Sequence, residues 1–258
     1  MKLAGRVAMI TAAGSGMGRE ASLVLAAEGA HVVVVDRDGD AAARTVEEIG
    51  KAGGAASREV CDVSDVSALR AMFERVGKAH GVLHALWSHA GIPGAAGFDI
   101  SEEEWYRAID VNMKSAFFCT SFGAPLLRKA DGKGSLIYTA SVSGLVGSPY
   151  SPLYSMAKGG IVNFTRATAV ALAKDGIRAN VICPAAIDTP MLPLFFGRTT
   201  TDQGAIDAEM QGFIAATVPL GRAGTTSEIA AAVLWLASDD SSFVTGVALP
   251  VDGGFTAR

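Results

Sequence analysis

The sequence has few of the residues that usually build metal centres and disulfide frameworks. Among 258 residues it has three cysteines and four histidines, and Cys61, Cys119 and Cys183 lie far apart with no Cys-x-x-Cys spacing. The apolar run that begins at Val7 is too short for a secretion signal. An odd number of scattered thiols in such a chain indicates reduced cysteines that pack in the core. The sequence therefore predicts neither a disulfide nor a metal site.

Long runs of charge and of apolar residues are also missing. The net charge is -4, the pI is near 5.6, and the longest basic run is the pair Arg128 and Lys129. A nucleic-acid-binding surface would need more clustered positive charge than this. The longest apolar helical run, residues 229–237, falls well short of the roughly 20 residues that cross a bilayer. We expect a soluble, cytoplasmic protein that binds neither nucleic acid nor membranes.

The sequence is rich in short apolar segments that alternate with longer helical patterns. Several of these segments are apolar on both faces, as the strands of a parallel sheet covered by helices must be. Strict alternation implies right-handed crossovers and a doubly wound sheet, and no linker or repeat divides the chain. We therefore predict an α/β fold, a single Rossmann-like doubly wound domain over residues 1–258 with helices on both faces of a seven-stranded parallel sheet. The expected strands are residues 7–10, 31–35, 56–60, 82–87, 135–140, 177–182 and 247–251.

Three polar residues are expected to begin helices. Ser64 precedes a helical pattern and is expected to be its N-cap. Ser101 with Glu104, and Thr225 with Glu228, have the spacing of capping boxes. In a sheet of this kind, ligands bind beyond the carboxyl ends of the strands.

A glycine-rich turn, 11-TAAGSGMG-18, follows the first expected strand and opens a helix. Closely spaced glycines let a pyrophosphate approach the backbone, and a helix N-terminus offers free N–H groups. The second expected strand ends at Asp36, 18 residues after Gly18, where a carboxylate can accept hydrogen bonds from an adenosine ribose. Arg37 beside it could tolerate a phosphate, but the Asp36 carboxylate would repel one. The pattern therefore favours NAD over NADP.

Tyr154 and Lys158 stand four residues apart in an expected helix and share one of its faces. Hydride transfer to a ketone, or from an alcohol, needs matched proton transfer at oxygen. A free tyrosine has a pKa near 10, and lowering it to neutrality requires roughly 4 kcal/mol. A cation about 4 Å away contributes about that much at an effective dielectric constant near 20. We therefore expect Lys158 to lower the pKa of Tyr154.

Taken in order, these motifs resemble the short-chain dehydrogenase/reductase family over nearly the whole chain. Residues 11–18 are similar to the family's Thr-Gly-x-x-x-Gly-x-Gly loop, and Tyr154 with Lys158 to its Tyr-x-x-x-Lys motif. The other similar stretches are Asp62-Val63, 88-SHAG-91, Asn112 in 110-DVNMKSAFF-118, Ser141 and 184-PAAIDT-189.

The resemblance implies catalytic roles for Asn112, Ser141, Tyr154 and Lys158. Lys158 would also hold the nicotinamide ribose, Ser141 would hydrogen-bond the substrate oxygen, and Asn112 would position a water. The resemblance further implies a homotetramer built through the helices around residues 113–127 and 161–173. The expected NAD-binding residues are Gly14, Ser15, Gly16, Met17, Gly18, Asp36, Arg37, Asp62, Val63, Ser88, His89, Ala90, Gly91, Tyr154, Lys158, Pro184, Ile187 and Thr189.

Some positions depart from the family pattern. Ala12 replaces the first glycine of the loop, which is feasible only if its φ is negative. Ser88 and His89 replace two asparagines, and Ala185 replaces the glycine after Pro184. We expect His89 to be a packed, hydrogen-bonded turn residue and not an acid or base.

Residues 188–217 interrupt the alternation as a long irregular insertion, and such segments at the ligand end of a sheet are usually lids. The insertion is rich in large apolar side chains, Phe213 among them, and has one basic residue, Arg198, against Asp202, Asp207 and Glu209. It therefore suits a neutral cyclic, aryl or medium-chain secondary alcohol. The expected substrate-binding residues are Ser143, Leu145, Tyr150, Met191, Leu192, Phe195 and Phe196.

Two other functions remain open at this point. A 3-oxoacyl thioester reductase would share the chemistry, but the net negative charge disfavours an acidic carrier protein and Asp36 disfavours NADPH. A non-catalytic nucleotide-binding regulatory protein would be expected to lack Tyr154, Lys158 or Ser141, and the sequence has all three.

Overall fold

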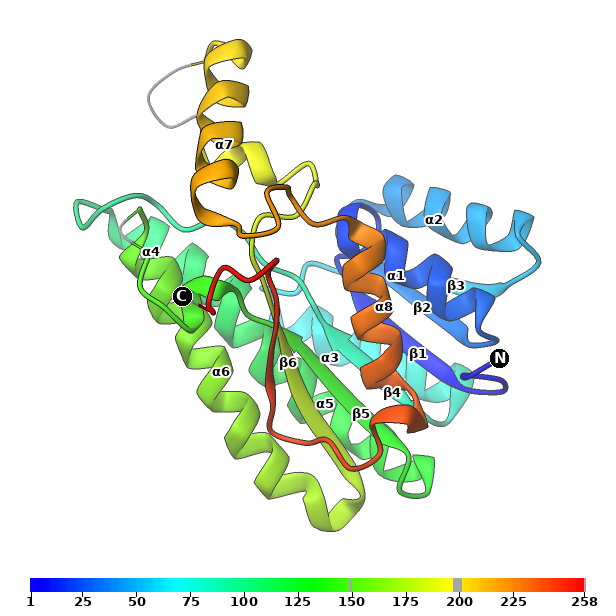
Figure 1. Cartoon of the computed structure of the whole chain (residues 1–258). Coiled ribbons are helices and arrows are strands. Elements are labelled where there is room, and N and C mark those ends of the chain that lie inside the picture. Colours follow the sequence, from blue (N-terminus) through cyan, green and yellow to red (C-terminus); the bar gives the residue numbers. More distant parts are fainter. Residues whose placement is uncertain (149, 197–200, 258) are drawn as a thin grey trace.

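A seven-stranded parallel sheet forms the centre of the computed structural model, which describes residues 1–148, 150–196 and 201–257 (Figure 1). The strand order is β3-β2-β1-β4-β5-β6-β7. This order and the parallel pairing confirm the predicted fold class. The strands are β1 Val7–Thr11, β2 His31–Asp36, β3 Ala55–Val60, β4 Ala85–Ser88, β5 Gly134–Thr139, β6 Ile177–Pro184 and β7 Ala248–Val251.

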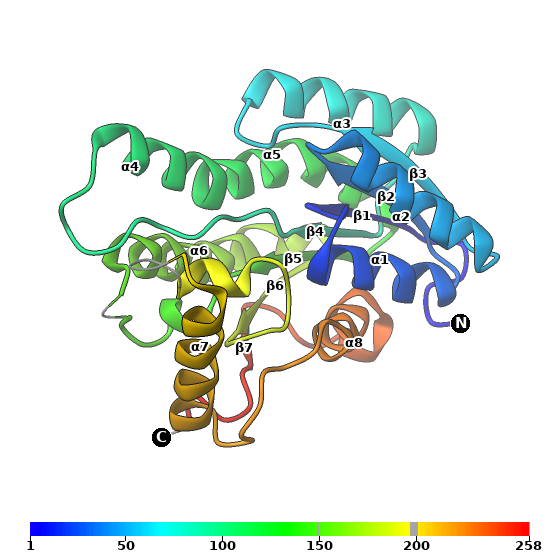
Figure 2. The ribbon, with the colours of Figure 1, turned by 90° about the horizontal axis from the view of Figure 1, so that it is seen from above.

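Helices cover both faces of the sheet (Figure 2). One face carries α1 Gly16–Ala27, α2 Gly39–Lys51 and α8 Thr226–Ala237. The other carries α3 Val66–His80, α5 Ser115–Leu127 and α6 Pro152–Leu172. Helix α4, Glu102–Ile109, runs into α5 through a π-helical turn at Asp110–Lys114. Helix α7, Gln203–Thr217, projects beyond the carboxyl ends of the strands.

The two faces of the sheet bury two separate hydrophobic clusters. In β2, Val32 and Val34 pack with α1 and α8, whereas Val33 and Val35 pack with α3 and α5. This division follows from the two-residue period of a strand, whose successive side chains point to opposite faces. The apolar run of β2, residues 32–35, therefore supplies side chains to both clusters.

The crevice of the fold lies between β1 and β4, where the strand order changes direction. From β1 the chain winds outward to β2 and β3, then returns past β1 to β4 and continues to β7. The loops after β1 and β4 therefore diverge and leave a space at the carboxyl edge, where sheets of this kind bind their ligands.

Both predicted capping boxes are present, but one predicted cap is wrong. Ser101 and Thr225 each pair reciprocally with the glutamate three residues later. The N-cap of α3 is Asp65, whose side chain accepts from two backbone N–H groups, while Ser64 donates to the Asp62 carboxylate instead. Asp and Ser cap helices about equally well, so the sequence did not separate these neighbours.

The predicted strand at residues 82–87 and the predicted irregular insertion also need correction. The strand is Ala85–Ser88. The second half of the insertion is the regular helix α7, which Asp202 caps by accepting from Gly204 N. Because only Ile214 of this helix is buried, its sequence has no continuous apolar stripe, and that is why its helical period was missed. Arg198 lies outside the described residues.

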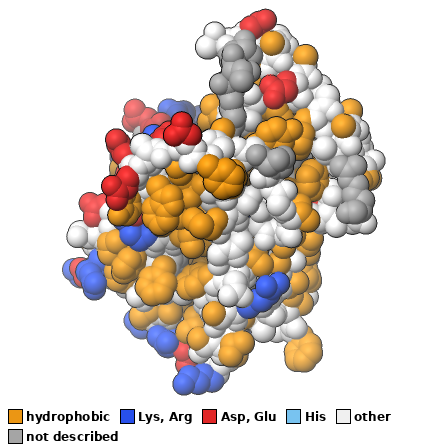
Figure 3. Space-filling model, turned by 90° about the vertical axis from the view of Figure 1, so that its left-hand side faces the viewer, with side chains coloured by type: hydrophobic (Ala, Val, Ile, Leu, Met, Phe, Trp, Pro, Cys, Tyr) orange, Lys and Arg blue, Asp and Glu red, His pale blue; other side chains and the backbone are white. Residues whose placement is uncertain are grey.

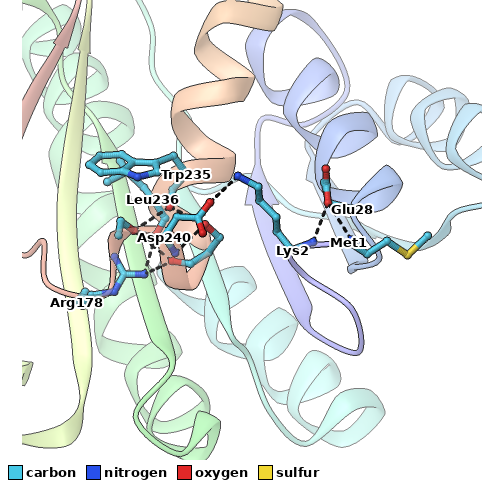
Figure 4. A network of polar contacts seen from close by, with 9 residues as sticks. Met1, Lys2, Glu28, Arg178, Trp235, Leu236 and Asp240 are labelled. Atoms are coloured by element: carbon cyan, nitrogen blue, oxygen red, sulfur yellow. Dashed lines mark hydrogen bonds and ion pairs between the residues drawn. The ribbon is translucent and has the colours of Figure 1, made fainter.

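A partly buried arginine on β6 holds the C-terminal end of α8 to the sheet (Figure 4). The Arg178 guanidinium donates to the carbonyl oxygens of Leu236 at 2.8 Å and Ser238 at 3.1 Å. These are carbonyls at the helix C-terminus, where a cation is favourable. Lys2 forms an ion pair with Asp240 in the same network. The start of the chain is thereby linked to the turn that follows α8.

The three cysteines are free and buried, as predicted. Among residues 1–148, 150–196 and 201–257, no helix is long and apolar enough to cross a membrane.

Candidate active site

Two adjoining cavities lie at the carboxyl edge of the sheet and share Ser141, Tyr154, Ala185, Leu192 and Phe195. We call the cavity beside the glycine-rich turn the inner cavity and the one beneath α7 the outer cavity. Many of the residues expected to bind NAD line the inner cavity, namely Ser15, Gly16, Met17, His89, Gly91, Tyr154, Lys158, Pro184, Ile187 and Thr189.

Tyr154 and Lys158 lie in the first two turns of α6. Ser151 is the N-cap of this helix, and its hydroxyl accepts from Tyr154 N and donates to Ala95 O at 2.7 Å. Pro152 occupies the first helical position, where its missing N–H costs nothing. The cap therefore fixes the helix end, and the four-residue spacing turns both functional groups toward the inner cavity.

Lys158 is buried and its ammonium lies against the end of β5. It donates to Thr139 O at 3.1 Å, and its Nζ is 5.4 Å from the centroid of the Tyr154 ring. Burial lowers the pKa of Lys158 to about 8. The ammonium is thus desolvated beside the inner cavity.

The expected effect of Lys158 on Tyr154 is not what the structure shows. Burial raises the pKa of Tyr154 above its usual value, and a hydrogen bond with Ser141 opposes this rise. A lower pKa for Tyr154 would need the ammonium close to the phenol oxygen, in a medium of intermediate dielectric constant. Instead Nζ lies over the tyrosine ring, and the loss of water around both groups dominates.

Ser141 joins the two cavities. It follows β5, its hydroxyl accepts from Ser143 N at 3.1 Å, and it hydrogen-bonds the Tyr154 side chain. A Cβ on Gly144 would come within 2.7 Å of the backbone of Lys158. The short helical turn after Ser141 can therefore pack directly on α6, and this close approach holds Ser141 beside Tyr154.

Asn112 is buried in the π-helical turn between α4 and α5. Its Oδ1 accepts from Ile92 N at 3.2 Å, and its Nδ2 donates to Ile92 O at 3.1 Å and to Ala108 O at 3.0 Å. The side chain thus pairs with both backbone groups of Ile92. A π-helical turn often marks a functional site, and here it places the amide next to the turn at residues 88–91.

Gly91 leaves a space beside Asn112 and Lys158. A Cβ at this position would lie 2.9 Å from Asn112 Oδ1 and 3.1 Å from Lys158 Nζ. The absent side chain keeps a cradle open next to the ammonium. The residues of the inner cavity therefore fit a flat, hydroxyl-bearing group such as the nicotinamide riboside end of a dinucleotide.

The glycine-rich turn contains a departure from our expectation. Ala12 has a φ of +55°, not the negative value that we expected. A non-glycine residue rarely adopts this left-handed region. The turn keeps the conformation because Gly18 packs on it, so closely that a Cβ on Gly18 would lie 2.2 Å from Ala12 O.

Asp36 at the end of β2 lies against the same turn. Its Oδ2 accepts from Gly14 N at 2.9 Å and its Oδ1 from Asp38 N at 3.0 Å. Each carboxylate oxygen retains a free lone pair. Arg37 is exposed beside it, and Asp62 ends the neighbouring strand region with its carboxylate bonded to Ser64.

His89 is packed and hydrogen-bonded, as expected. Its ring stacks on Trp87 at 4.2 Å between centroids, and its Nδ1 lies 3.0 Å from Thr139 Oγ1. Burial lowers its pKa to about 3, so the ring is neutral. The backbone N–H groups of His89 and Ala90 both donate to Thr11 Oγ1, which joins the ends of β1 and β4.

Several expected NAD-binding residues do not line the inner cavity. Ser88 is buried and hydrogen-bonds Cys119 in the core. Val63 and Ala90 pack in or against the core formed with α3 and α5. The remaining members of this group are Gly14, Gly18, Asp36, Arg37 and Asp62, which lie in the glycine-rich turn or at the ends of β2 and β3.

The outer cavity encloses about 910 Å³, including space open to solvent. Of the expected substrate-binding residues, Ser143, Tyr150, Leu192, Phe195 and Phe196 line it. The other two do not line it: Met191 lines only the inner cavity, and Leu145 packs against the core. Both lie next to residues that do line the outer cavity, and a shift of one position in a turn was enough to redirect them.

Phe213 of α7 is the hub of an aromatic cluster in the outer cavity. Its ring centroid lies 5.4 Å from Phe196, 6.2 Å from Tyr150 and 6.4 Å from Phe255. Sequence reasoning missed Phe255, which follows β7 and is far from the other rings in the sequence. The parallel sheet brings it near because β7 and β6 end at the same edge.

The arrangement places three polar groups where the cavities meet. The hydroxyls of Ser141 and Tyr154 can both reach an oxygen at this junction, and the ammonium of Lys158 lies behind them. Such a set can hold a carbonyl or hydroxyl oxygen and exchange a proton with it. Among residues 1–148, 150–196 and 201–257, no three His, Cys, Asp or Glu side chains lie close enough to hold a metal ion.

Known proteins are similar in sequence to this chain along nearly its full length. A family model described as enoyl-(acyl carrier protein) reductase matches residues 11–256. Cyclohexanol dehydrogenase of Acinetobacter sp. (strain SE19) is 36% identical over 259 residues and aligns with 100% of this chain and 97% of its own. Meso-2,3-butanediol dehydrogenase of Serratia marcescens is 36% identical over 258 residues, with coverage of 100% and 97%.

A more distant relative and a solved structure extend the comparison. The 3-oxoacyl-acyl-carrier-protein reductase of Thermotoga maritima is 33% identical over 255 residues and covers 98% of this chain and 99% of its own. The crystal structure of levodione reductase superimposes with a TM-score of 0.92, at 32% identity and 99% coverage of both chains. The chain therefore belongs to the short-chain dehydrogenase/reductase family of oxidoreductases, which use nicotinamide cofactors.

Proposed function

We propose that this protein is an NAD-dependent oxidoreductase that interconverts a neutral, apolar secondary alcohol and its ketone. The observation that carries the proposal is the junction of the two cavities, where Ser141 and Tyr154 lie between an aromatic outer cavity and an inner cavity suited to a nicotinamide. Bound NAD would supply the hydride acceptor, or in reduced form the donor.

The residues of the chain would divide the remaining work. Ser141 orients the substrate oxygen, and Tyr154 exchanges the proton with it. Lys158 binds ribose hydroxyls in the cradle beside Gly91, while Asn112 holds the turn at residues 88–92 in place. The aromatic cluster around Phe213 binds the apolar part of the substrate.

The preference for NAD rests on Asp36. Its carboxylate faces the glycine-rich turn and keeps a free lone pair on each oxygen for the ribose hydroxyls. A phosphate on that ribose would bring about two negative charges beside this carboxylate. The two like charges would repel each other, whereas a free diol would donate hydrogen bonds.

A substrate and cofactor panel tests the proposal. We expect kcat/KM for cyclohexanol to exceed that for 2-propanol or a sugar polyol, and NAD to be preferred over NADP by tenfold or more. Asp36→Ala should narrow the cofactor preference, whereas Asp40→Ala, an exposed carboxylate on α2, should leave it unchanged. Equal use of NADP by the wild type would contradict the cofactor assignment.

A 3-oxoacyl thioester reductase remains the second candidate, because one relative carries that name. It would take NADPH and an acyl thioester. Higher kcat/KM for acetoacetyl thioester with NADPH than for cyclohexanone with NADH would favour this function.

We also propose a single catalytic domain with residues 188–217 as the substrate lid, and a homotetramer. The support for assembly is an apolar surface on the side of α4 and α6 (Figure 3). Its exposed members include Trp105, Tyr106, Phe117 and Met156. Exposed aromatic groups of this kind usually mark an interaction surface.

A further inference from the structure

One carboxylate lines the outer cavity and has no part in the proposed chemistry. Glu209 is the only residue with a formal charge among the described residues that line this cavity. The others are aromatic, aliphatic, serine or glycine residues. A carboxylate in such surroundings acts on any charged substituent that enters.

Among the residues that the structure describes, none compensates the charge of Glu209. It stands one helical turn before Phe213 on the same face of α7, and both residues line the outer cavity. The nearest charges along the helix, Asp202 and Asp207, are also negative. In residues 188–196 and 201–221 there is no Lys or Arg, and within the described parts of the chain the Glu209 carboxylate has no hydrogen-bond or ion-pair partner.

The aromatic rings add to the same preference. The faces of Phe and Tyr rings attract cations, and Tyr150, Phe196 and Phe213 surround the cavity that Glu209 borders. A carboxylate next to such rings repels an anionic substituent and attracts a cationic one. The cavity would therefore discriminate between substrates by repelling anionic ones as well as by attracting cationic ones.

We infer that Glu209 is the residue that sets the charge of the substrates accepted by the outer cavity. It excludes secondary alcohols that carry a carboxylate at the end distal to the carbinol, and it accepts those that carry a protonated amine there. This inference rests on the proposed function, because it assumes that the outer cavity holds the substrate.

Three ring alcohols of matched shape test the inference: cyclohexanol, 4-aminocyclohexanol and 4-hydroxycyclohexanecarboxylate. For the wild type, we expect kcat/KM for the amine to exceed that for the carboxylate by tenfold or more at low ionic strength. Glu209→Gln, which keeps the shape and removes the charge, should reduce this ratio at least fivefold. Because Glu209 is exposed to solvent, added salt should screen its charge and reduce the ratio in the wild type.

Asp207→Asn is the matched control, since it removes one negative charge from the same helix at a position that does not line the cavity. It should change the ratio less than twofold. An unchanged ratio in Glu209→Gln, or equal changes in both variants, would overturn the inference.

Calorimetric binding of the three alcohols to the enzyme with reduced cofactor separates this inference from the proposed function. If none of the alcohols is turned over, the proposed function is wrong, and the ratio of the dissociation constants still decides the role of Glu209. Equal dissociation constants for the amine and the carboxylate in the wild type would refute that role.

Discussion

Tyr154 is partly buried and Lys158 is buried, and loss of water acts on their two pKa values in opposite senses. It raises the pKa of the phenol and lowers that of the ammonium to about 8. In the free protein the phenol is therefore protonated at neutral pH, as donation of a proton to a ketone oxygen requires. Ser141, which hydrogen-bonds the same phenol, counteracts the rise.

Removing the phenol hydroxyl should abolish most of the activity and little else. We expect Tyr154→Phe to lower kcat by about 10²- to 10⁴-fold, the usual contribution of a general acid or base. Its circular dichroism spectrum and its dissociation constant for NAD should stay near the wild-type values. Tyr150→Phe is the control, because Tyr150 lines the outer cavity without bonding Ser141. Wild-type turnover by Tyr154→Phe would refute the assigned role.

Lys158 should destabilise the free protein at neutral pH. Its pKa in the folded state is about 8, against 10.5 for the unperturbed group, which corresponds to a penalty of about 3 kcal/mol. Because the folded pKa is the lower one, the penalty is fully present below about pH 8 and disappears as the pH rises toward 10.5. Lys158→Met should therefore be inactive and more stable than the wild type at pH 7, with a smaller difference at pH 10.

Urea denaturation of the cofactor-free proteins at both pH values measures this effect. The lost hydrogen bond to Thr139 O makes the gain smaller than the full penalty. A Lys158→Met protein that is less stable than the wild type at pH 7, with no change between the two pH values, would contradict the prediction.

At the scale of elements, α7 contributes to the outer cavity more than to the core. Its one buried residue is Ile214, and Phe213 is the hub of the aromatic cluster. Phe213→Ala should lower kcat/KM for cyclohexanol about tenfold, because it removes roughly 1.5 kcal/mol of apolar contact. Steady-state rates and thermal unfolding together test this. Gln211→Ala, at an exposed position of the same helix, should change neither.

An equal loss of kcat/KM for cyclohexanol and 2-propanol in Phe213→Ala would show that the ring does not contact the substrate. A large fall in the melting temperature would show instead that α7 supports the fold.

The elements that were predictable from the sequence are those with a local signal. The strand β2 was identified because HVVVVD is apolar on both faces, and the two capping boxes because both partners lie within four residues. The helix α7 was missed because it buries too little to show a period. The positive φ of Ala12 was also missed, since the packing of Gly18 on its carbonyl is a tertiary contact.

In the candidate site, too, the residues with a local sequence motif were predictable and those placed by tertiary structure were not. Tyr154, Lys158 and Ser141 were found through motifs, and the structure brings them together. Phe255 was not found, because its place in the outer cavity depends on how β7 returns beside β6. The sequence also did not predict that the pKa of Tyr154 is raised, because this shift depends on burial.

At the scale of the whole molecule, the apolar side of α4, α5 and α6 predicts assembly. Phe117 is half exposed and its ring lies 5.8 Å from that of Phe164 on α6. We expect Phe117→Glu to reduce the molar mass in solution, measured by light scattering after gel filtration, because a buried charge destabilises an interface. Val60→Glu, on the edge strand β3 at the other side of the sheet, should keep the wild-type mass. A wild-type protein that elutes as a monomer would contradict the proposed tetramer.

The separation of α7 from the two hydrophobic clusters bears on how this protein can change over evolutionary time. Tyr154, Lys158 and Ser141 are held by the sheet and by α6. The described residues of 188–217 supply few buried apolar side chains, chiefly Leu192 and Ile214. Substitutions in that segment can reshape the outer cavity while the residues that handle the proton stay in place. Natural variants and laboratory libraries should therefore acquire new substrates through changes in this one stretch of chain, with little loss of folding stability.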